Sequence, residues 1–283
     1  MLRRAMIFAM VSFFGFMFIS IPAHPGFAGD EGSQSPLEKI KWQEGPSTSD
    51  LGKVAEVRVP AGYMFAGANE MKTIMESGQN IASGDEVGFL TEPSSNLEMY
   101  FDFIEAGYVK DDEKGSLDAD AMLKSLKAGN EKANEERRKR GWGELKMIGW
   151  EVPPRYNETS HNLEWAIRLQ NKEGELINFN TRLLGRNGYM KVTLVTAPQT
   201  FQETIPKFRT IVSDISYKSG HRYAEYRTGD KVAKYGLSAL VVGGAAAAAT
   251  KAGVFKGLWK LIVAAGAGVL VVAKRFFGKK EVA

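Results

Sequence analysis

The chain has 283 residues, a formal net charge of +4 and no cysteine. The absence of cysteine excludes disulfides, thiolate zinc sites, a cysteine nucleophile and the lipid-modified cysteine of a lipoprotein. Four basic residues (Lys274, Arg275, Lys279 and Lys280) lie in the last ten positions, so the positive charge indicates a basic tail and not a surface for nucleic acid.

Residues 1–28 have the organisation of a secretory signal peptide. Arg3 and Arg4 precede an uncharged apolar stretch, and residues 26–28 offer small side chains for cleavage after Ala28. An uncleaved anchor is the alternative, but about 17 apolar residues are at the short limit for spanning a bilayer. We therefore predict an exported chain, with residues 29–41 as a polar linker of little core potential.

The strands of the body are predicted where apolar and polar residues alternate along the chain and where turn residues separate such segments. They are expected at 54–59, 87–91, 97–104, 145–150, 163–169, 176–184 and 189–196. In 97–104, apolar residues alternate with Glu98, Tyr100 and Asp102, which predicts a single buried face. The last two strands form a hairpin whose connection contains Asn187 and Gly188, a pair suited to the positive φ angles of a tight turn.

Two helices complete the body. The first is expected at 117–140, capped by Ser116 or Asp118, and the second runs to about Ser213. The second begins either at Thr200, with Glu203 in a capping box, or at Thr204, with Pro206 in the first turn. Strands, a helix, antiparallel strands and a helix predict an α+β domain over residues 42–230, with helices packed on one antiparallel sheet.

Residues 231–283 are predicted to be a C-terminal membrane anchor with a basic tail. One solution is a single helix over about 254–276, with Lys256 and Lys260 at its outer end, and the other is a helical hairpin. A single span leaves the basic tail in the cytoplasm, as the positive-inside rule favours. A buried or amphipathic helix pair is a third interpretation. We predict a bacterial inner-membrane protein that contacts the lipid bilayer through this segment, with its soluble domain in the periplasm.

Several groups of charged residues and histidines have sequence patterns that favour a structural role over metal binding or catalysis. His161 and His221 lack the spacing of a metal site. A group of acidic residues between positions 111 and 120 lacks the alternating spacing of a calcium-binding loop. The basic run at 132–140 is interleaved with glutamates at helical pairing distance, although a contact with lipid headgroups stays open. Serine-nucleophile, P-loop and dinucleotide motifs are absent, so no catalytic residue, metal, cofactor or nucleic acid is expected. The acidic group consists of Asp111, Asp112, Glu113, Asp118 and Asp120.

The candidate ligand site lies on one side of two neighbouring strands, opposite the apolar side. If Trp165 points to the core, the alternating charged residues of its strand point away from it. In the next strand, two asparagines and an arginine alternate with apolar residues, and such side chains make directed hydrogen bonds to an anionic or peptide-like ligand. A solvated face, or one bonded to a covering helix, is the alternative. The predicted ligand-binding residues are Glu164, Arg168, Asn178, Asn180 and Arg182.

Five blocks of sequence occur together in a familiar order. They are 107–112, 117–142, 149–156 with Gly149, Trp150, Pro153 and Pro154, 178–186, and 222–237. In these blocks the chain resembles the membrane-anchored bacterial family called domain of unknown function 2167, from about Trp42 to the C-terminal apolar segment. The resemblance implies a signal peptide, an extracytoplasmic body and a membrane segment, and it implies no activity. The order of elements also resembles the Mog1/PsbP-like α/β/α sandwich.

The function favoured by these features is a non-catalytic binding module of the bacterial envelope, whose partner is an envelope protein or a small ligand. One alternative is an envelope hydrolase or transferase with a site that only the fold assembles, for which His161, Glu164 and Arg182 are candidates. Another is an accessory subunit of a membrane complex, working through its helix of small residues.

Overall fold

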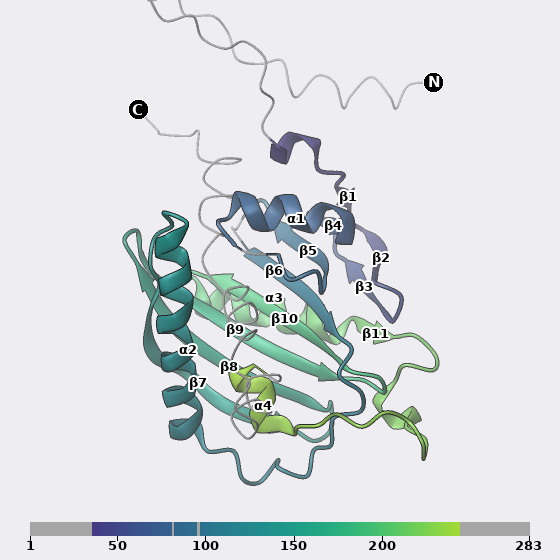
Figure 1. Ribbon diagram of the computed structural model, residues 1–283. Helices are drawn as coiled ribbons and strands as arrows, with labels where there is room; N and C mark the ends of the chain where they lie inside the picture. The colour runs from purple at the N-terminus through teal and green to yellow at the C-terminus, as the bar shows by residue number, and fades with distance from the viewer. Residues whose placement is uncertain (1–35, 81, 95–96, 244–283) are drawn as a thin grey trace, which may run out of the picture. The chain divides into compact units, whose positions relative to one another are not determined.

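The computed structural model describes residues 36–80, 82–94 and 97–243 (Figure 1). The predicted signal peptide and the predicted span from residue 254 lie outside the described residues. Within these ranges, no helix combines the length and the apolar character needed to cross a membrane.

Two antiparallel sheets form the centre of the domain. The larger contains β1 (Gln43–Glu44), β4 (Met64–Gly67), β5 (Glu86–Glu92), β6 (Leu97–Ile104), β7 (Lys146–Asn157), β8 (Asn162–Asn171), β9 (Gly174–Leu184) and β10 (Tyr189–Thr196). Its order is β1-β4-β5-β6-β10-β9-β8-β7. The smaller contains β2 (Ser47–Leu51), β3 (Ala55–Val59) and β11 (Ile215–Tyr217). The predicted α+β fold with a large antiparallel sheet is confirmed.

Both faces of the large sheet are covered, as Figure 1 shows. One face, here called the α2 face, packs against α1 (Ala68–Ser77), α2 (Ala119–Lys139) and α4 (Leu237–Val242). The other, the α3 face, packs against α3 (Phe201–Ser213) and the small sheet. Short 3-10 turns lie at Pro36–Lys39 and Tyr223–Glu225. The domain therefore has two apolar cores, one on each side of the large sheet.

This double covering corrects the prediction for β6. Phe101 points into the α3-face core, as expected for the apolar side of the strand. Glu98, Tyr100 and Asp102 are buried as well, on the α2 face. The prediction of a single buried face is wrong because helices cover the side that the sequence pattern assigns to solvent.

The ends of the elements mostly follow the sequence signals. Asp118 caps α2, because its carboxylate accepts the backbone N–H of Ala121 at 2.9 Å. Thr200 precedes α3 without a side-chain cap, and Pro206 lies inside that helix.

The predicted hairpin of β9 and β10 is confirmed, because Tyr189 pairs with Leu184 and the Gly185 N–H donates to the Gly188 carbonyl at 2.8 Å. The positive φ angles expected at Asn187 and Gly188 are absent. A glycine is required at position 188 for a different reason, which is the lack of room for a side chain. A Cβ at position 188 would lie 2.0 Å from the carbonyl oxygen of Ile104 in β6.

The compact domain extends beyond the predicted limits of 42 and 230. Leu37 and Ile40, placed in the predicted linker, are buried in the α2-face core. At the other end Leu237 and Leu240 of α4 are buried in the same core, although the prediction assigns them to the anchor. Residues 36–41 therefore have core potential, and α4 is part of the domain that carries the site.

Candidate functional site

Rows of paired side chains build a polar patch in the middle of the α2 face. The register of β6, β10 and β9 places Asp102, Lys191 and Arg182 side by side. Because residues two apart along a strand share a face, the following rows lie on the same side. These rows consist of Tyr100, Thr193, Asn180 and Trp165, and of Glu98, Val195, Asn178 and Ile167.

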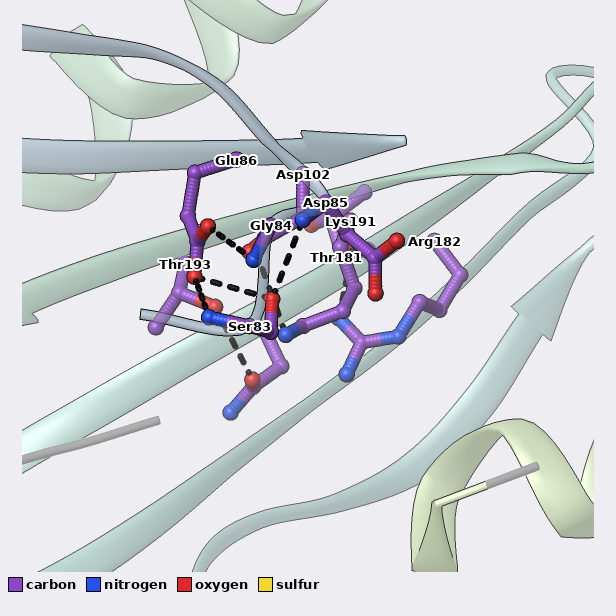
Figure 2. Close-up of polar contacts among 10 residues, drawn as sticks. Ser83, Gly84, Asp85, Glu86, Asp102, Thr181, Arg182, Lys191 and Thr193 are labelled. Carbon is purple, nitrogen blue, oxygen red and sulfur yellow. Dashed lines mark hydrogen bonds and ion pairs between the residues drawn. The ribbon is translucent and has the colours of Figure 1, made fainter. Parts of the chain in front are cut away.

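The carboxylates at one end of this patch already have partners. Lys191 Nζ lies 3.2 Å from Asp102 Oδ2, and both side chains are buried. Glu86 accepts the backbone N–H groups of Ser83 and Gly84 at 2.7 and 2.8 Å (Figure 2). Burial, and then the nearby Asp102 and Glu86 carboxylates, raise the pKa of Asp85, while Lys191 opposes this shift. The ammonium of Lys191 is therefore balanced by its acidic neighbours.

Arg182 is the charged residue of the patch without an acidic partner of its own. Its side chain is only 5% exposed, and among the described residues it makes no ion pair. Nη1 donates to the backbone carbonyl of Thr181 at 3.1 Å, and the guanidinium carbon lies 4.5 Å from the ring centroid of Trp165. Nε is buried and has no hydrogen-bond partner. Burial lowers the pKa of Arg182 to about 10, so the guanidinium stays charged at neutral pH.

A cavity of about 90 Å³ lies above these residues. Its polar floor includes Arg182, Lys191, Asn178 and Asn180. The carbonyl oxygen of the Asn178 side chain is a second buried polar atom without a partner. The walls are mainly apolar and come from α2, β7 with the residue before it, β8 and α4; they consist of Leu126, Leu145, Met147, Ile167, Leu169, Leu240, Val241 and Val242. The pocket therefore combines an apolar enclosure with two buried cations, of which Lys191 is paired with Asp102 and Arg182 makes no ion pair with a described residue.

The structure divides the five predicted ligand residues between the two faces of the sheet. Asn178, Asn180 and Arg182 share one side of β9, as predicted, and all three line the cavity. Glu164 and Arg168 lie on the α3 face, where Glu164 pairs with Arg209 of α3 at 3.7 Å. Arg168 pairs with Glu151 and Glu175.

The predicted separation of an apolar from a polar face is therefore wrong. Trp165 lies opposite Asn180 in the register and shares its face. Because helices cover both sides of the sheet, the polar residues of β9 are buried beside aliphatic ones instead of facing solvent.

The proposed enzyme site does not assemble either. Glu164 and Arg182 lie on opposite faces of the sheet, so they share no cleft. His161 instead contacts Tyr156, whose hydroxyl lies 3.1 Å from His161 Nδ1 and 3.1 Å from Asp111 Oδ2. Across the described ranges, no group of three or more histidine, aspartate or glutamate side chains is arranged to hold a metal ion.

Asp102, Lys191 and Trp165 belong to the site but were not predicted as site residues. The signal for the first two was the presence of charged residues in two otherwise mainly apolar strands, Asp102 together with Glu98 in 97–104 and Lys191 in 189–196. A charge in such a strand is costly unless it has a partner, and the partner comes from the neighbouring strand.

Residues 43–274 match the family described as "Protein of unknown function (DUF2167)". The chain belongs to this family. The resemblance inferred from the sequence is therefore confirmed for the DUF2167 family. No curated protein matches the chain. Among solved structures, the solution structure of cyanobacterial PsbP (CyanoP) from Synechocystis sp. PCC 6803 is similar at 12% identity and a TM-score of 0.36, covering 68% of this chain and 98% of its own.

Glu98 gives this DUF2167 domain a specific pH dependence. The side chain is 2% exposed and accepts a hydrogen bond from the Tyr100 hydroxyl at 3.3 Å. Burial raises the pKa of the Glu98 carboxyl well above its ordinary value. The folded-state pKa of Glu98 therefore lies above its unfolded-state pKa of about 4.3. The carboxyl makes its full contribution to stability below about pH 4.3, where it is protonated in both states. The contribution is lost as the pH rises toward the folded pKa.

We therefore expect Glu98→Gln to be more stable than the parent at pH 7 and to lose this part of the pH dependence. The difference should grow by at most about 1.4 kcal/mol per pH unit above pH 4.3. Urea unfolding at pH 4, 5, 6 and 7 measures it, with the exposed Glu173→Gln as the matched control. A difference between parent and Glu98→Gln that stays constant over this range would contradict the burial argument.

Proposed function

We propose that this chain is a non-catalytic binding module of the bacterial envelope, and that its pocket on the α2 face takes a small anionic ligand at Arg182. One observation carries the proposal. A guanidinium that is 5% exposed points into a cavity, has an unpartnered Nε and makes no ion pair with any described carboxylate.

Energetics supports an anion at this position. Burying an ion without a counter-charge costs several kcal/mol, even after relaxation of the protein. The contact with Trp165 returns about 0.5–2 kcal/mol. The single hydrogen bond to Thr181 adds about 1.5–3 kcal/mol, the usual range for a hydrogen bond to a charged group. A bound anion would supply both the missing charge and an acceptor for Nε.

The location of the module is part of the same proposal. The signal-like organisation of residues 1–28 and the apolar C-terminal sequence with its basic end support an exported domain tethered to the inner membrane. Protease shaving of spheroplasts that make the chain with a C-terminal tag tests this topology. Digestion of the domain with protection of the tag is expected. Digestion only after lysis would place the domain in the cytoplasm and refute the proposal.

Ligand binding is tested with the full-length protein purified in a neutral detergent. Isothermal titration with sodium carboxylates, phosphate and sulfate, each against sodium chloride, is expected to show saturable binding of at least one anion. Arg182→Met should weaken that binding about tenfold to a hundredfold, because a hydrogen bond to a charged group is worth about 1.5–3 kcal/mol.

The matched control is Arg155→Met, which removes an exposed arginine of β7 outside the cavity. It should bind like the parent. Binding that is insensitive to Arg182→Met, or no binding of any anion, would refute a pocket organised around Arg182.

A further inference from the structure

We infer that the ligand is a short aliphatic monocarboxylate of about two to four carbons. This inference rests on the proposed function and narrows it from any small anion to one chemical class. Three properties of the pocket carry it: the geometry of the guanidinium, the charge around it and the size and character of the walls.

The geometry of the guanidinium favours a carboxylate. Nη1 of Arg182 is engaged by the carbonyl of Thr181, which leaves the edge formed by Nε and Nη2. A second arginine of the domain binds a carboxylate through the same edge of its guanidinium. Arg186 Nε and Nη2 each lie 2.7 Å from one carboxylate oxygen of Asp230. Two parallel N–H groups match the two oxygens of a planar carboxylate.

The charge around Arg182 favours a single negative charge. Asp102 is close enough to raise the pKa of the guanidinium, although burial outweighs it. The Asp102 carboxylate is paired with Lys191 at 3.2 Å. A monoanion would neutralise Arg182, whereas the second charge of a dianion would lie unpaired in a buried site near Asp102. A dianion such as sulfate therefore carries a desolvation cost that a monocarboxylate avoids.

The walls and the volume set the rest of the ligand. Leu126, Ile167, Leu240 and Val241 present aliphatic surface with no hydrogen-bonding group, so the remainder of the ligand is apolar. The cavity measures about 90 Å³. An aliphatic cavity of about 150 Å³ holds a benzene molecule, so this one has room for roughly four heavy atoms, or a few more with side-chain relaxation. Acetate meets these conditions directly, and propionate and butyrate, which have one and two more heavy atoms, meet them with side-chain relaxation.

Isothermal titration of the full-length protein in a neutral detergent tests the inference with acetate, propionate, butyrate, hexanoate, 1-butanol and phosphate. We expect saturable binding of the short acids and none of 1-butanol or phosphate. Hexanoate should bind about tenfold more weakly than butyrate, because its extra methylenes would overpack the cavity. Equal or tighter binding of hexanoate would overturn the size argument.

Variants separate this inference from the proposed function. Arg182→Lys keeps the positive charge but loses the two parallel N–H groups, and it should weaken butyrate binding about tenfold. Val242→Phe reduces the volume of the cavity and should weaken the binding of butyrate more than the binding of acetate. Near-ultraviolet circular dichroism identifies any variant that fails to fold. Phosphate binding that depends on Arg182, without carboxylate binding, would overturn the monocarboxylate and keep the anion module. No binding of any anion would overturn both.

Discussion

Asp102→Leu is expected to destabilise the domain by about 3–5 kcal/mol, the usual cost of removing one partner of a buried ion pair. Asp102 and Lys191 are 4% and 7% exposed, and Lys191 Nζ lies 3.2 Å from the carboxylate. Without Asp102, the ammonium of Lys191 would lie beside the guanidinium of Arg182, its direct neighbour in the register of β9 and β10. Urea unfolding at pH 7 measures the loss.

The double variant Asp102→Leu/Lys191→Met is the matched control. Replacing a whole buried ion pair with apolar side chains of similar volume is often neutral or stabilising. We therefore expect the double variant to recover most of the stability lost in the single variant. A double variant that is as unstable as Asp102→Leu would show that packing, and not the unpaired charge, causes the loss.

Trp165→Ala is expected to cost about 3–5 kcal/mol, the usual range for removing a large aromatic side chain from a core. Trp165 is 1% exposed and lies in the α2-face core. Its ring also supports the Arg182 guanidinium at 4.5 Å. The substitution should therefore weaken anion binding as well as stability, and both are measured by urea unfolding and by titration with butyrate.

Trp165→Phe separates these two roles of the ring. Phenylalanine keeps an aromatic face under Arg182 and fills most of the volume, so its cost in stability should be clearly smaller than that of alanine. Equal losses of stability for the two variants would contradict an aromatic role of Trp165 in the patch. Unchanged butyrate binding in Trp165→Ala would show that Arg182 does not depend on the ring.

The sequence predicts most of the large sheet because its strands carry regular alternation. β6 and β10 have the predicted bounds, and their register joins them directly. β2, with the polar sequence STSDL, has no such pattern and was not predicted. α1 was also missed, although Met71, Ile74 and Met75 lie at helical spacing and are buried.

The site is only partly readable from the sequence because it depends on tertiary packing. Alternation along β9 correctly places Asn178, Asn180 and Arg182 on one side. Whether that side faces solvent or a core depends on α2 and α4, which come from distant parts of the chain. The pairing of Asp102 with Lys191 depends on the register between β6 and β10, and no local pattern specifies it.

The two ends of the large sheet determine how the domain behaves when many copies are close together. An exposed edge strand can pair with the edge of another molecule and start aggregation. β1, at one edge, is only two residues long. β7, at the other edge, contains Pro153 and Pro154, which lack backbone N–H donors, and its register against β8 shifts at several points. Neither edge offers the long, regular row of hydrogen-bonding groups that sheet extension needs, so crowded copies are expected to remain separate domains.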